Sequence, residues 1–453
     1  MKRFVSADRD QPFLLPPNLR DWVPENDLAH FIVEAAGRVD HAKFKINHHG
    51  TGSAQYDPGM MLALLVYCYS NGIFSSRRIE RATRFDVRVR FVAANTHPDH
   101  DTIAKFRREN FDAVAEAFLQ VLQLAKELKL LKVGTISVDG TKLNANANIH
   151  KSIRYDRAVE LRDQLRLEID ELLKNAESSD RTDTAEPESL PNEIARRAEL
   201  RDKLDAAIAR LEAEAKTRAA AERSDREEKA KTKPQQDDDD APAPPSEPPS
   251  DKPAPEQQTN LTDPESRIMR KNRRSEYRQA YNAQAAVDAD GSQLILAARV
   301  SQSASDKNEL VPMVDAVTQN VGAPTTALAD TGYANGDAVA DIEGRGTDCL
   351  VATRGEGVRR QHDFRPTPEK KTVKEPKAPW LVKMNAKMQE AAARAKYRLR
   401  KQTVEPVFGI IKQGLGFRQF LLRGIEKVRG EWQLVALAYN CRRLHTLMLR
   451  PAA

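Results

Sequence analysis

Patterns typical of short β-strands recur along this chain, and their order limits the folds available to it. The first lies at 133–144 and is rich in β-branched residues. The next two, at 281–288 and 293–300, flank a short turn, and helical and strand patterns then alternate towards the end of the chain. A strand, an insertion, two strands and then alternating helices and strands predict a mixed α/β sheet with helices on its faces.

The insertion itself has a helical part and a polar part. Residues 151–232 are rich in Glu, Arg, Leu and Ala, with apolar residues at helical spacing on both sides of a break, which favours a helical hairpin. A plain antiparallel coiled coil without catalytic residues explains this pattern. Residues 233–262 contain the acidic run Asp237–Asp240, many prolines and few apolar side chains, so we expect a disordered linker there.

Residues 1–125 are expected to be helical and to bind DNA. The apolar run at 60–69 suits a buried helix, and short capped turns join the helices around it. A basic face on helices of this kind resembles a helix-turn-helix DNA-binding domain, although a solvated helix face would carry the same charges. The basic residues concerned are Arg77, Arg78, Arg81, Arg84, Arg107 and Arg108.

Charge is unevenly distributed along the chain. Among its 453 residues, Lys and Arg number 72 and Asp and Glu 66, which gives a net charge of only +6. Basic residues nevertheless gather at 77–108 and at 392–429, which suggests a polyanionic partner. The sequence lacks a signal peptide, a stretch long enough to span a membrane, and cysteine spacings typical of metal sites or disulfides. We therefore expect a cytoplasmic protein with buried free thiols.

Three carboxylates are candidate metal ligands. Asp139 and Asp330 each end a predicted strand and precede a glycine-containing turn, at the edge where open α/β sheets bind ligands. Glu405 would supply a third carboxylate from a helix. Carboxylates without His or Cys favour Mg²⁺ or Mn²⁺, and two such ions can promote phosphoryl transfer. An aspartate before a glycine is, taken singly, more often an ordinary turn residue.

The segment around Glu405 predicts how that carboxylate is held. Thr403 is a good helix N-cap, and Pro406 is tolerated in a first turn, so we expect a helix to begin at Thr403. Lys412 follows Glu405 by two turns and falls on the same face. A carboxylate and a lysine are thus expected side by side on one rigid element.

Four motifs in a fixed order carry a family resemblance. They are SVDGTKLNANA at 137–147, YNAQAAVD at 281–288, ADTGY at 329–333 and VEPVFGIIK at 404–412. With them the chain resembles the DDE transposases of bacterial insertion sequences, in the branch with a helical InsH-type N-terminal domain. The resemblance covers nearly the whole chain apart from 176–262.

The resemblance implies an RNase H-like catalytic domain split over 130–150 and 263–450, with Asp139, Asp330 and Glu405 holding two Mg²⁺ or Mn²⁺ ions. It also implies an activity. The protein would bind the terminal inverted repeats of its own element, cleave double-stranded DNA and join the 3′-OH ends to target DNA. It would act as a homo-oligomer in the bacterial cytoplasm, associated with the nucleoid when bound to DNA.

The resemblance further implies DNA contacts near the third carboxylate. Lys412 matches the basic residue that follows the family's glutamate. The arginine position ahead of it is filled by Lys401, while Arg400 lies one residue away and Tyr397 is also displaced. Lys142, beside the first aspartate, is a further candidate. Two alternatives remain open: a catalytically inactive DNA-binding protein derived from a transposase, and an RNase H-like nuclease that cuts without joining.

Overall fold

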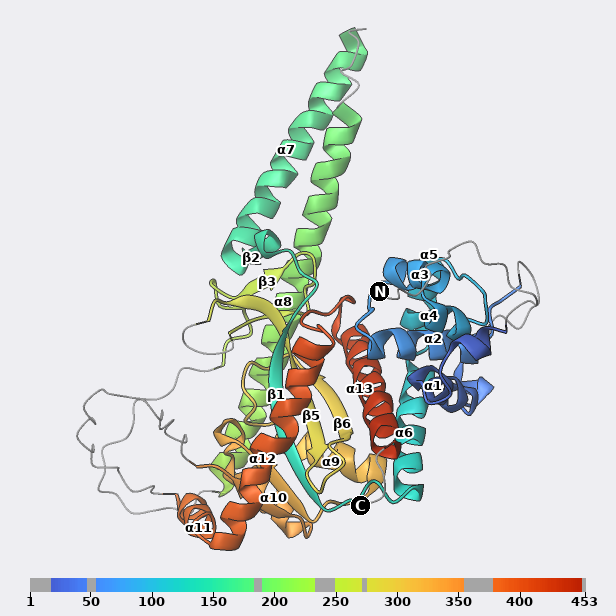
Figure 1. Ribbon diagram of the computed structural model, residues 1–453. Helices are drawn as coiled ribbons and strands as arrows, with labels where there is room; N and C mark the ends of the chain where they lie inside the picture. The colour runs from blue at the N-terminus through green and yellow to red at the C-terminus, as the bar shows by residue number, and fades with distance from the viewer. Residues whose placement is uncertain are drawn as a thin grey trace, which may run out of the picture. The chain divides into compact units, whose positions relative to one another are not determined.

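The structure is a computed structural model (Figure 1). The chain divides into two compact units, one formed by residues up to 143 together with those from 281 onward, the other by residues 144–280. Most of the expected linker, 233–248, lies outside the described residues. The described residues are 18–46, 54–182, 190–232, 249–270, 275–353 and 378–449.

The first unit begins with a cluster of helices. Several of them start where an aspartate side chain accepts a backbone N–H: Asp57 from Met60, and Asp99 from Thr102. The second helix is buried over its last ten residues, as its apolar sequence predicts. The helices are α1 (Leu28–Gly37), α2 (Pro58–Ser70), α3 (Ser76–Phe85), α4 (Val87–Val92), α5 (His100–Glu109) and α6 (Phe111–Glu127).

The sheet of this unit is mixed, with strand order β6–β5–β1–β7–β8. Three strands run parallel: β1 (Thr135–Asn144), β7 (Thr326–Ala329) and β8 (Asp348–Val351). The other two, β5 (Arg278–Asp288) and β6 (Ile295–Ser301), form an antiparallel hairpin. This confirms the predicted mixed α/β sheet, and the arrangement is consistent with an RNase H-like core.

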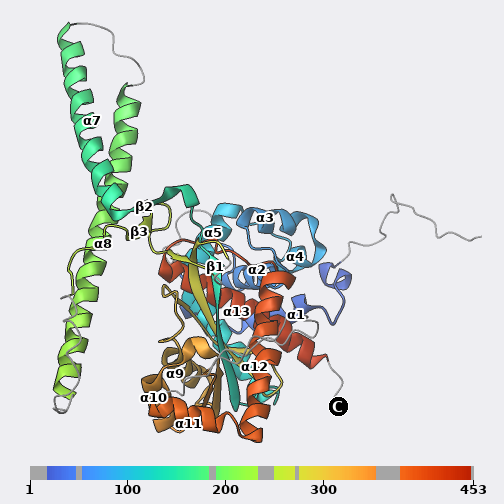
Figure 2. The same ribbon diagram turned by 90° about the vertical axis from the view of Figure 1, so that its left-hand side faces the viewer.

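Helices cover this sheet (Figures 1 and 2). The last of them, α13, connects the sheet to the N-terminal helices, because it packs on β6 and also against α2 and α6. Its buried Trp432 donates to the backbone oxygen of Gln284, and Asn440 bonds both the N–H and the C=O of Ile295. The helices are α9 (Leu310–Val321), α10 (Gly336–Gly344), α11 (Pro379–Lys387), α12 (Ala391–Gly409) and α13 (Ile425–Met448).

Two element boundaries predicted from the sequence are wrong, and the first is the end of β1. The strand does not end at Asp139 but continues to Asn144. It does so because β5 lies beside it and provides a hydrogen-bonding partner, so a sequence that looks like an Asp-Gly turn stays extended.

The second wrong boundary is the start of the helix that carries Glu405. Helix α12 already begins at Ala391, so Thr403 is an interior residue whose hydroxyl donates to the Leu399 carbonyl (2.9 Å). Pro406 also lies inside the helix and has no N–H to offer the Gln402 carbonyl. That carbonyl instead accepts from Gln293 Nε2 (2.8 Å), which compensates for the missing bond. A π-helical turn, Ile410–Gly414, follows and carries Lys412.

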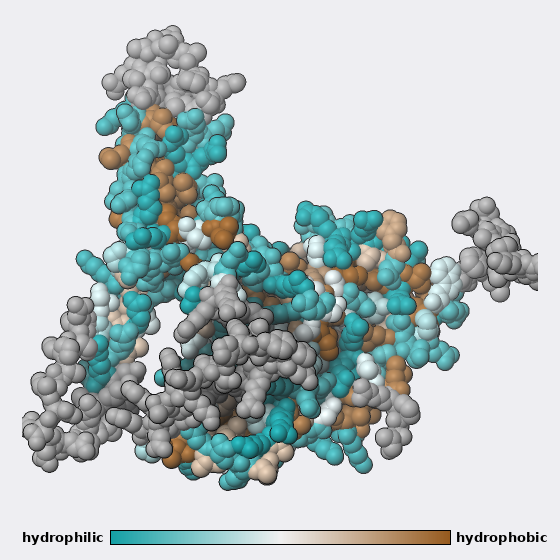
Figure 3. All heavy atoms as spheres, turned by 60° about the vertical axis from the view of Figure 1, so that its left-hand side comes forward, coloured by the Kyte–Doolittle hydropathy of each residue, from teal (hydrophilic) through white to brown (hydrophobic). Residues whose placement is uncertain are grey.

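The second unit contains a long helical hairpin. Helices α7 (Tyr155–Thr182) and α8 (Leu190–Thr232) lie side by side (Figures 1 and 2). An apolar cluster that includes Leu165 and Ile208 joins them, and ion pairs such as Arg166–Asp205 flank it. The surface of the hairpin, at the upper left of Figure 3, is mostly hydrophilic.

Three short strands complete this unit. Strand β3 (Gln258–Asn260) pairs with β2 (Ser152–Arg154), and β4 (Arg267–Met269) pairs with residues 278–280. The expected linker therefore ends earlier than 262. The buried Asn260 fixes this end, because its Nδ2 donates to the Asn148 carbonyl. Across the described ranges, no helix is long and apolar enough to span a membrane.

Candidate active site

Asp139 and Asp330 lie beside each other on neighbouring parallel strands. The register pairs Thr135 with Thr326 and Ser137 with Leu328, and each aspartate follows two residues after that last pair. Neighbouring strands are about 4.8 Å apart, so the two carboxylates leave the sheet at the same level. Asp330 also caps the short helix η4 (Thr331–Tyr333) by accepting from Gly332 N (2.8 Å). Sheet geometry thus brings together two of the three predicted ligands.

The electrostatics of Asp139 reflect this crowding. The pKa of Asp139 is raised from 3.8 to about 6, chiefly by burial and next by the nearby charge of Asp330. Arg400 opposes the shift, as does the backbone N–H of Gly140, which donates to Asp139 Oδ1 (2.8 Å). A neighbouring cation therefore stabilises the ionised form of Asp139, which burial and Asp330 disfavour.

Arg400 of α12 provides that cation. Its two terminal nitrogens lie 3.3 Å from Asp139 Oδ2 and 3.3 Å from Glu405 Oε1, so one guanidinium joins the first and third predicted ligands. The Arg400 side chain is only 11 % exposed. Arg400 was expected to contact DNA; here it lies among the carboxylates, five residues before Glu405 on α12.

The three carboxylates are of the chemical type that binds hard divalent ions. All three offer oxygen atoms, and a positive group already lies between two of them. The Glu405 side chain is 49 % exposed and contacts Arg400. Among the residues described, no group of three or more His, Cys, Asp and Glu is close enough to hold a metal. A metal site here therefore requires Glu405 to move closer to the two aspartates.

Two lysines lie along β1 beside Asp139. Lys412, on the π-helical turn, donates to Thr141 Oγ1 and to the Lys142 carbonyl (3.3 Å). Lys142 Nζ lies 3.2 Å from Asp306 Oδ1. Lys412 thus reaches the strand of the first aspartate from the π-helical turn that follows α12.

Other predicted DNA contacts separate into exposed and buried residues. Arg107 is 6 % exposed and donates to Tyr69 Oη and to the Phe74 carbonyl, both at 2.9 Å, so it is a core residue. Tyr397 is also buried, packed with Leu328 and Leu350. The structure thus places both side chains in the core and not on the exposed surface of their helices. Exposed residues are Arg77, Arg78, Arg81, Arg84, Arg108 and Lys401.

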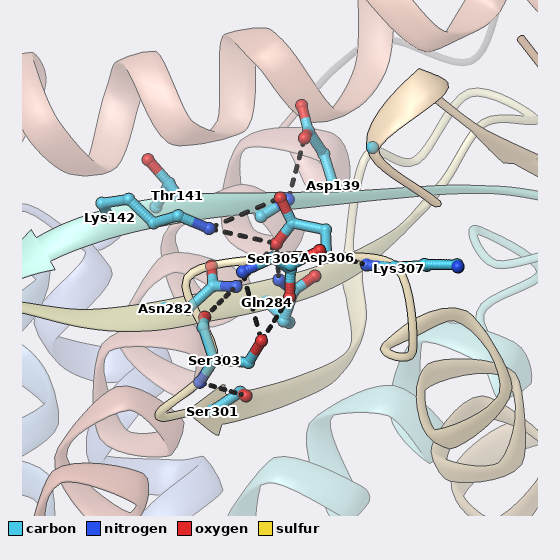
Figure 4. A network of polar contacts seen from close by, with 12 residues as sticks. Asp139, Thr141, Lys142, Asn282, Gln284, Ser301, Ser303, Ser305, Asp306 and Lys307 are labelled. Carbon is cyan, nitrogen blue, oxygen red and sulfur yellow. Dashed lines mark hydrogen bonds and ion pairs between the residues drawn. The ribbon is translucent and has the colours of Figure 1, made fainter. Parts of the chain in front are cut away.

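Sequence reasoning missed a polar cluster beneath the two aspartates. Asp306 accepts from Asn282 Nδ2 (2.6 Å) and Gln284 Nε2 (2.7 Å), as Figure 4 shows. Asn282 and Gln284 belong to the YNAQAAVD motif and alternate on one face of β5. These two amides, in the mostly apolar segment 281–287, were a usable signal, whereas Asp306 stands in the loop before α9.

Comparison with known protein families gives two matches. Residues 17–109 match the family described as Transposase domain (DUF772), and residues 237–441 match the family Transposase DDE domain. The chain belongs to the DDE transposases. No curated protein and no solved structure gives a significant match.

This membership confirms the predicted resemblance to DDE transposases and makes the protein a catalytic transposase with DNA as its partner. DDE transposases generally use divalent metal ions. The matched DDE region contains Asp330 and Glu405 but begins after Asp139. The assignment of Asp139 therefore rests on its strand register with β7.

Removing the Asp139 carboxylate should stabilise the metal-free transposase at neutral pH but not near pH 4. With its pKa at about 6, folded Asp139 retains a proton that the unfolded chain loses at about 3.8. Stability of the wild type therefore falls as pH rises through that window, by about 3 kcal/mol in total. Thermal unfolding in EDTA should show Asp139→Asn gaining over wild type between pH 4 and 6. A pH-independent difference would contradict this.

Proposed function

We propose that this DDE transposase binds the terminal inverted repeats of a bacterial insertion sequence, cleaves them and joins the 3′-OH ends to target DNA. The observation that carries the proposal is the placement of Asp139 and Asp330 on adjacent parallel strands, with Glu405 joined to Asp139 through Arg400. Carboxylate oxygens are the ligands of the divalent ions that promote phosphoryl transfer.

In this proposal Asp139, Asp330 and Glu405 hold two Mg²⁺ or Mn²⁺ ions. Bound there, such ions supply Lewis acidity to a water or 3′-hydroxyl nucleophile and to the leaving oxygen. Arg400 pairs with Asp139 and Glu405 in the metal-free protein and keeps the glutamate near the sheet. Its guanidinium, with five donors, is then suited to a DNA phosphate at the same place.

The DNA duplex would contact two basic surfaces. Lys412 and Lys401 flank the carboxylates on the α12 side. The N-terminal helices, proposed as a DNA-binding domain over 1–125, present the second surface, because the arginines of α3 point into solvent. Arg108 of α5 adds to that surface. The catalytic domain would comprise 130–150 and 263–450, and the active form a homo-oligomer that holds both ends.

The direct test is movement of a marker flanked by the DNA ends that surround the gene, with the transposase supplied separately. Excision and integration of the marker would support the full proposal. A protein that only binds the ends is a DNA-binding derivative without catalysis. A protein that cuts the ends but yields no strand-transfer product is a nuclease. Each of these last two outcomes would overturn the proposal.

Lys412→Ala should reduce cleavage of purified DNA ends by roughly 10–100-fold, the effect of losing one charge-assisted hydrogen bond in the transition state. The melting temperature should change little, because Lys412 is only half-buried. Lys427→Ala, an exposed lysine of α13, is the matched control and should cleave like wild type. Equal cleavage by Lys412→Ala and wild type would refute the assigned role.

A further inference from the structure

Asp306 accepts an unusual number of donors for a loop carboxylate. Besides Asn282 and Gln284 of β5, Lys142 of β1 reaches the same Oδ1 atom (3.2 Å), as Figure 4 shows. The Asp306 side chain is 23 % exposed. With three donors on one oxygen, this carboxylate is committed to protein contacts. Its role is therefore to hold neighbouring groups in place.

The side chains of Asn282, Gln284 and Asp306 lie close to the backbone of Gly140, the residue that follows Asp139. A Cβ added to Gly140 would collide with Gln284 Nε2 and lie 2.8 Å from Asp306 Oδ1. A side chain at position 140 would therefore displace the ends of Gln284 and Asp306, because these occupy the space of a Cβ. Because Gly140 directly follows Asp139, any shift of Gln284 or Asp306 against Gly140 would also move Asp139.

The same cluster contacts the segment that carries Asp330. Gln284 Oε1 accepts from the hydroxyl of Tyr333, which is fully buried in the ADTGY turn. A Cβ at Gly332 would lie 3.0 Å from Asp330 Oδ1 and 3.6 Å from Asp306 Cβ. Gln284 thus has one end against the Asp139 strand and the other bonded to the Asp330 turn.

We propose that Gln284 and Asp306 are positioning residues that set the separation of Asp139 and Asp330 and thereby the affinity of the site for divalent ions. The inference rests on the proposed metal site. It adds two residues that no sequence motif assigns to a role. Partners that orient metal ligands typically contribute 10–100-fold to metal affinity.

The test is Mn²⁺ binding to the DNA-free transposase, followed by electron paramagnetic resonance. Gln284→Met keeps size and charge but removes both hydrogen bonds, so Mn²⁺ affinity should fall about tenfold or more. Tyr333→Phe removes one hydroxyl and should give a smaller loss in the same direction. It also serves as the second variant if Gln284→Met folds poorly. Gln319→Met, at an exposed site on α9, should bind Mn²⁺ like wild type.

Asp306→Asn separates positioning from simple charge. It should lower Mn²⁺ affinity by at least as much as Gln284→Met, with little change in end binding. If Asp306→Asn weakens Mn²⁺ binding while Gln284→Met and Tyr333→Phe do not, Asp306 acts only through its charge and the inference fails. If wild type binds no Mn²⁺, the metal site fails and the inference with it. Wild-type binding with unchanged variants would overturn the inference alone.

Discussion

Replacing Glu431 with leucine is expected to destabilise the transposase by about 3–5 kcal/mol, because it leaves a buried arginine without its counter-charge. Glu431 lies in α13 and is 0 % exposed. It accepts from the backbone N–H groups of Leu421 (2.9 Å) and Leu422 (3.0 Å) and from the Tyr69 hydroxyl (3.2 Å). Burial raises the pKa of Glu431, and Arg107 and these donors oppose that shift.

Urea denaturation of the full chain measures this effect. Glu426→Leu is the matched control, since Glu426 lies on the same helix with an 81 % exposed side chain and a surface ion pair, so its loss should cost under about 1 kcal/mol. Adding Arg107→Met to Glu431→Leu should recover part of the stability, because both buried charges are then gone. A Glu431→Leu protein within about 1 kcal/mol of wild type would show that the network contributes little.

Asp139→Asn is expected to reduce DNA cleavage by at least about 10³-fold, which corresponds to roughly 4 kcal/mol of transition-state stabilisation. The amide keeps the size of the side chain but loses the charge that a divalent ion requires. Asp330→Asn and Glu405→Gln should have effects of the same order, because all three carboxylates would share the ions. The measurement is single-turnover cleavage of DNA ends in Mg²⁺ and in Mn²⁺.

Two comparisons make this result specific to the site. Asp337→Asn, an exposed aspartate in the first turn of α10, should cleave at the wild-type rate. The inactive variants should still bind DNA ends, and Asp139→Asn should unfold at a higher temperature than wild type at pH 7. A triad variant that cleaves normally would remove that carboxylate from the assignment.

The sequence was informative wherever local chemistry decided the structure. Strand patterns before Asp139 and Asp330 were enough to expect both aspartates in the sheet, and strand pairing then placed them at one level. The length of β1 could not be predicted, because its continuation past Gly140 depends on β5. The helix start at Thr403 failed for a similar reason, since the bond from Gln293 lets Pro406 lie inside α12.

The contacts of residues whose partners lie far away in the sequence could not be predicted from local patterns. Arg107 has the spacing of a basic surface residue, but it is buried and donates to Tyr69, whose hydroxyl in turn donates to Glu431 of the distant helix α13. Asp306 stands in a loop, and its donors come from two strands, β1 and β5. The place of Arg400 between two carboxylates likewise follows from the packing of α12 on the sheet.

The packing of α13 on both the sheet and the N-terminal helices has a consequence for where DNA is cut. Ser70 of α2 donates to the Ala438 carbonyl (3.0 Å), and Arg442 donates to the Ser70 carbonyl (3.1 Å), so the two helices are directly connected. If α3 holds a recognised sequence, the number of base pairs from there to Asp139 is set by folded protein. The cleavage position relative to the recognised sequence would then be fixed by the packing of α13 on α2 and on the sheet.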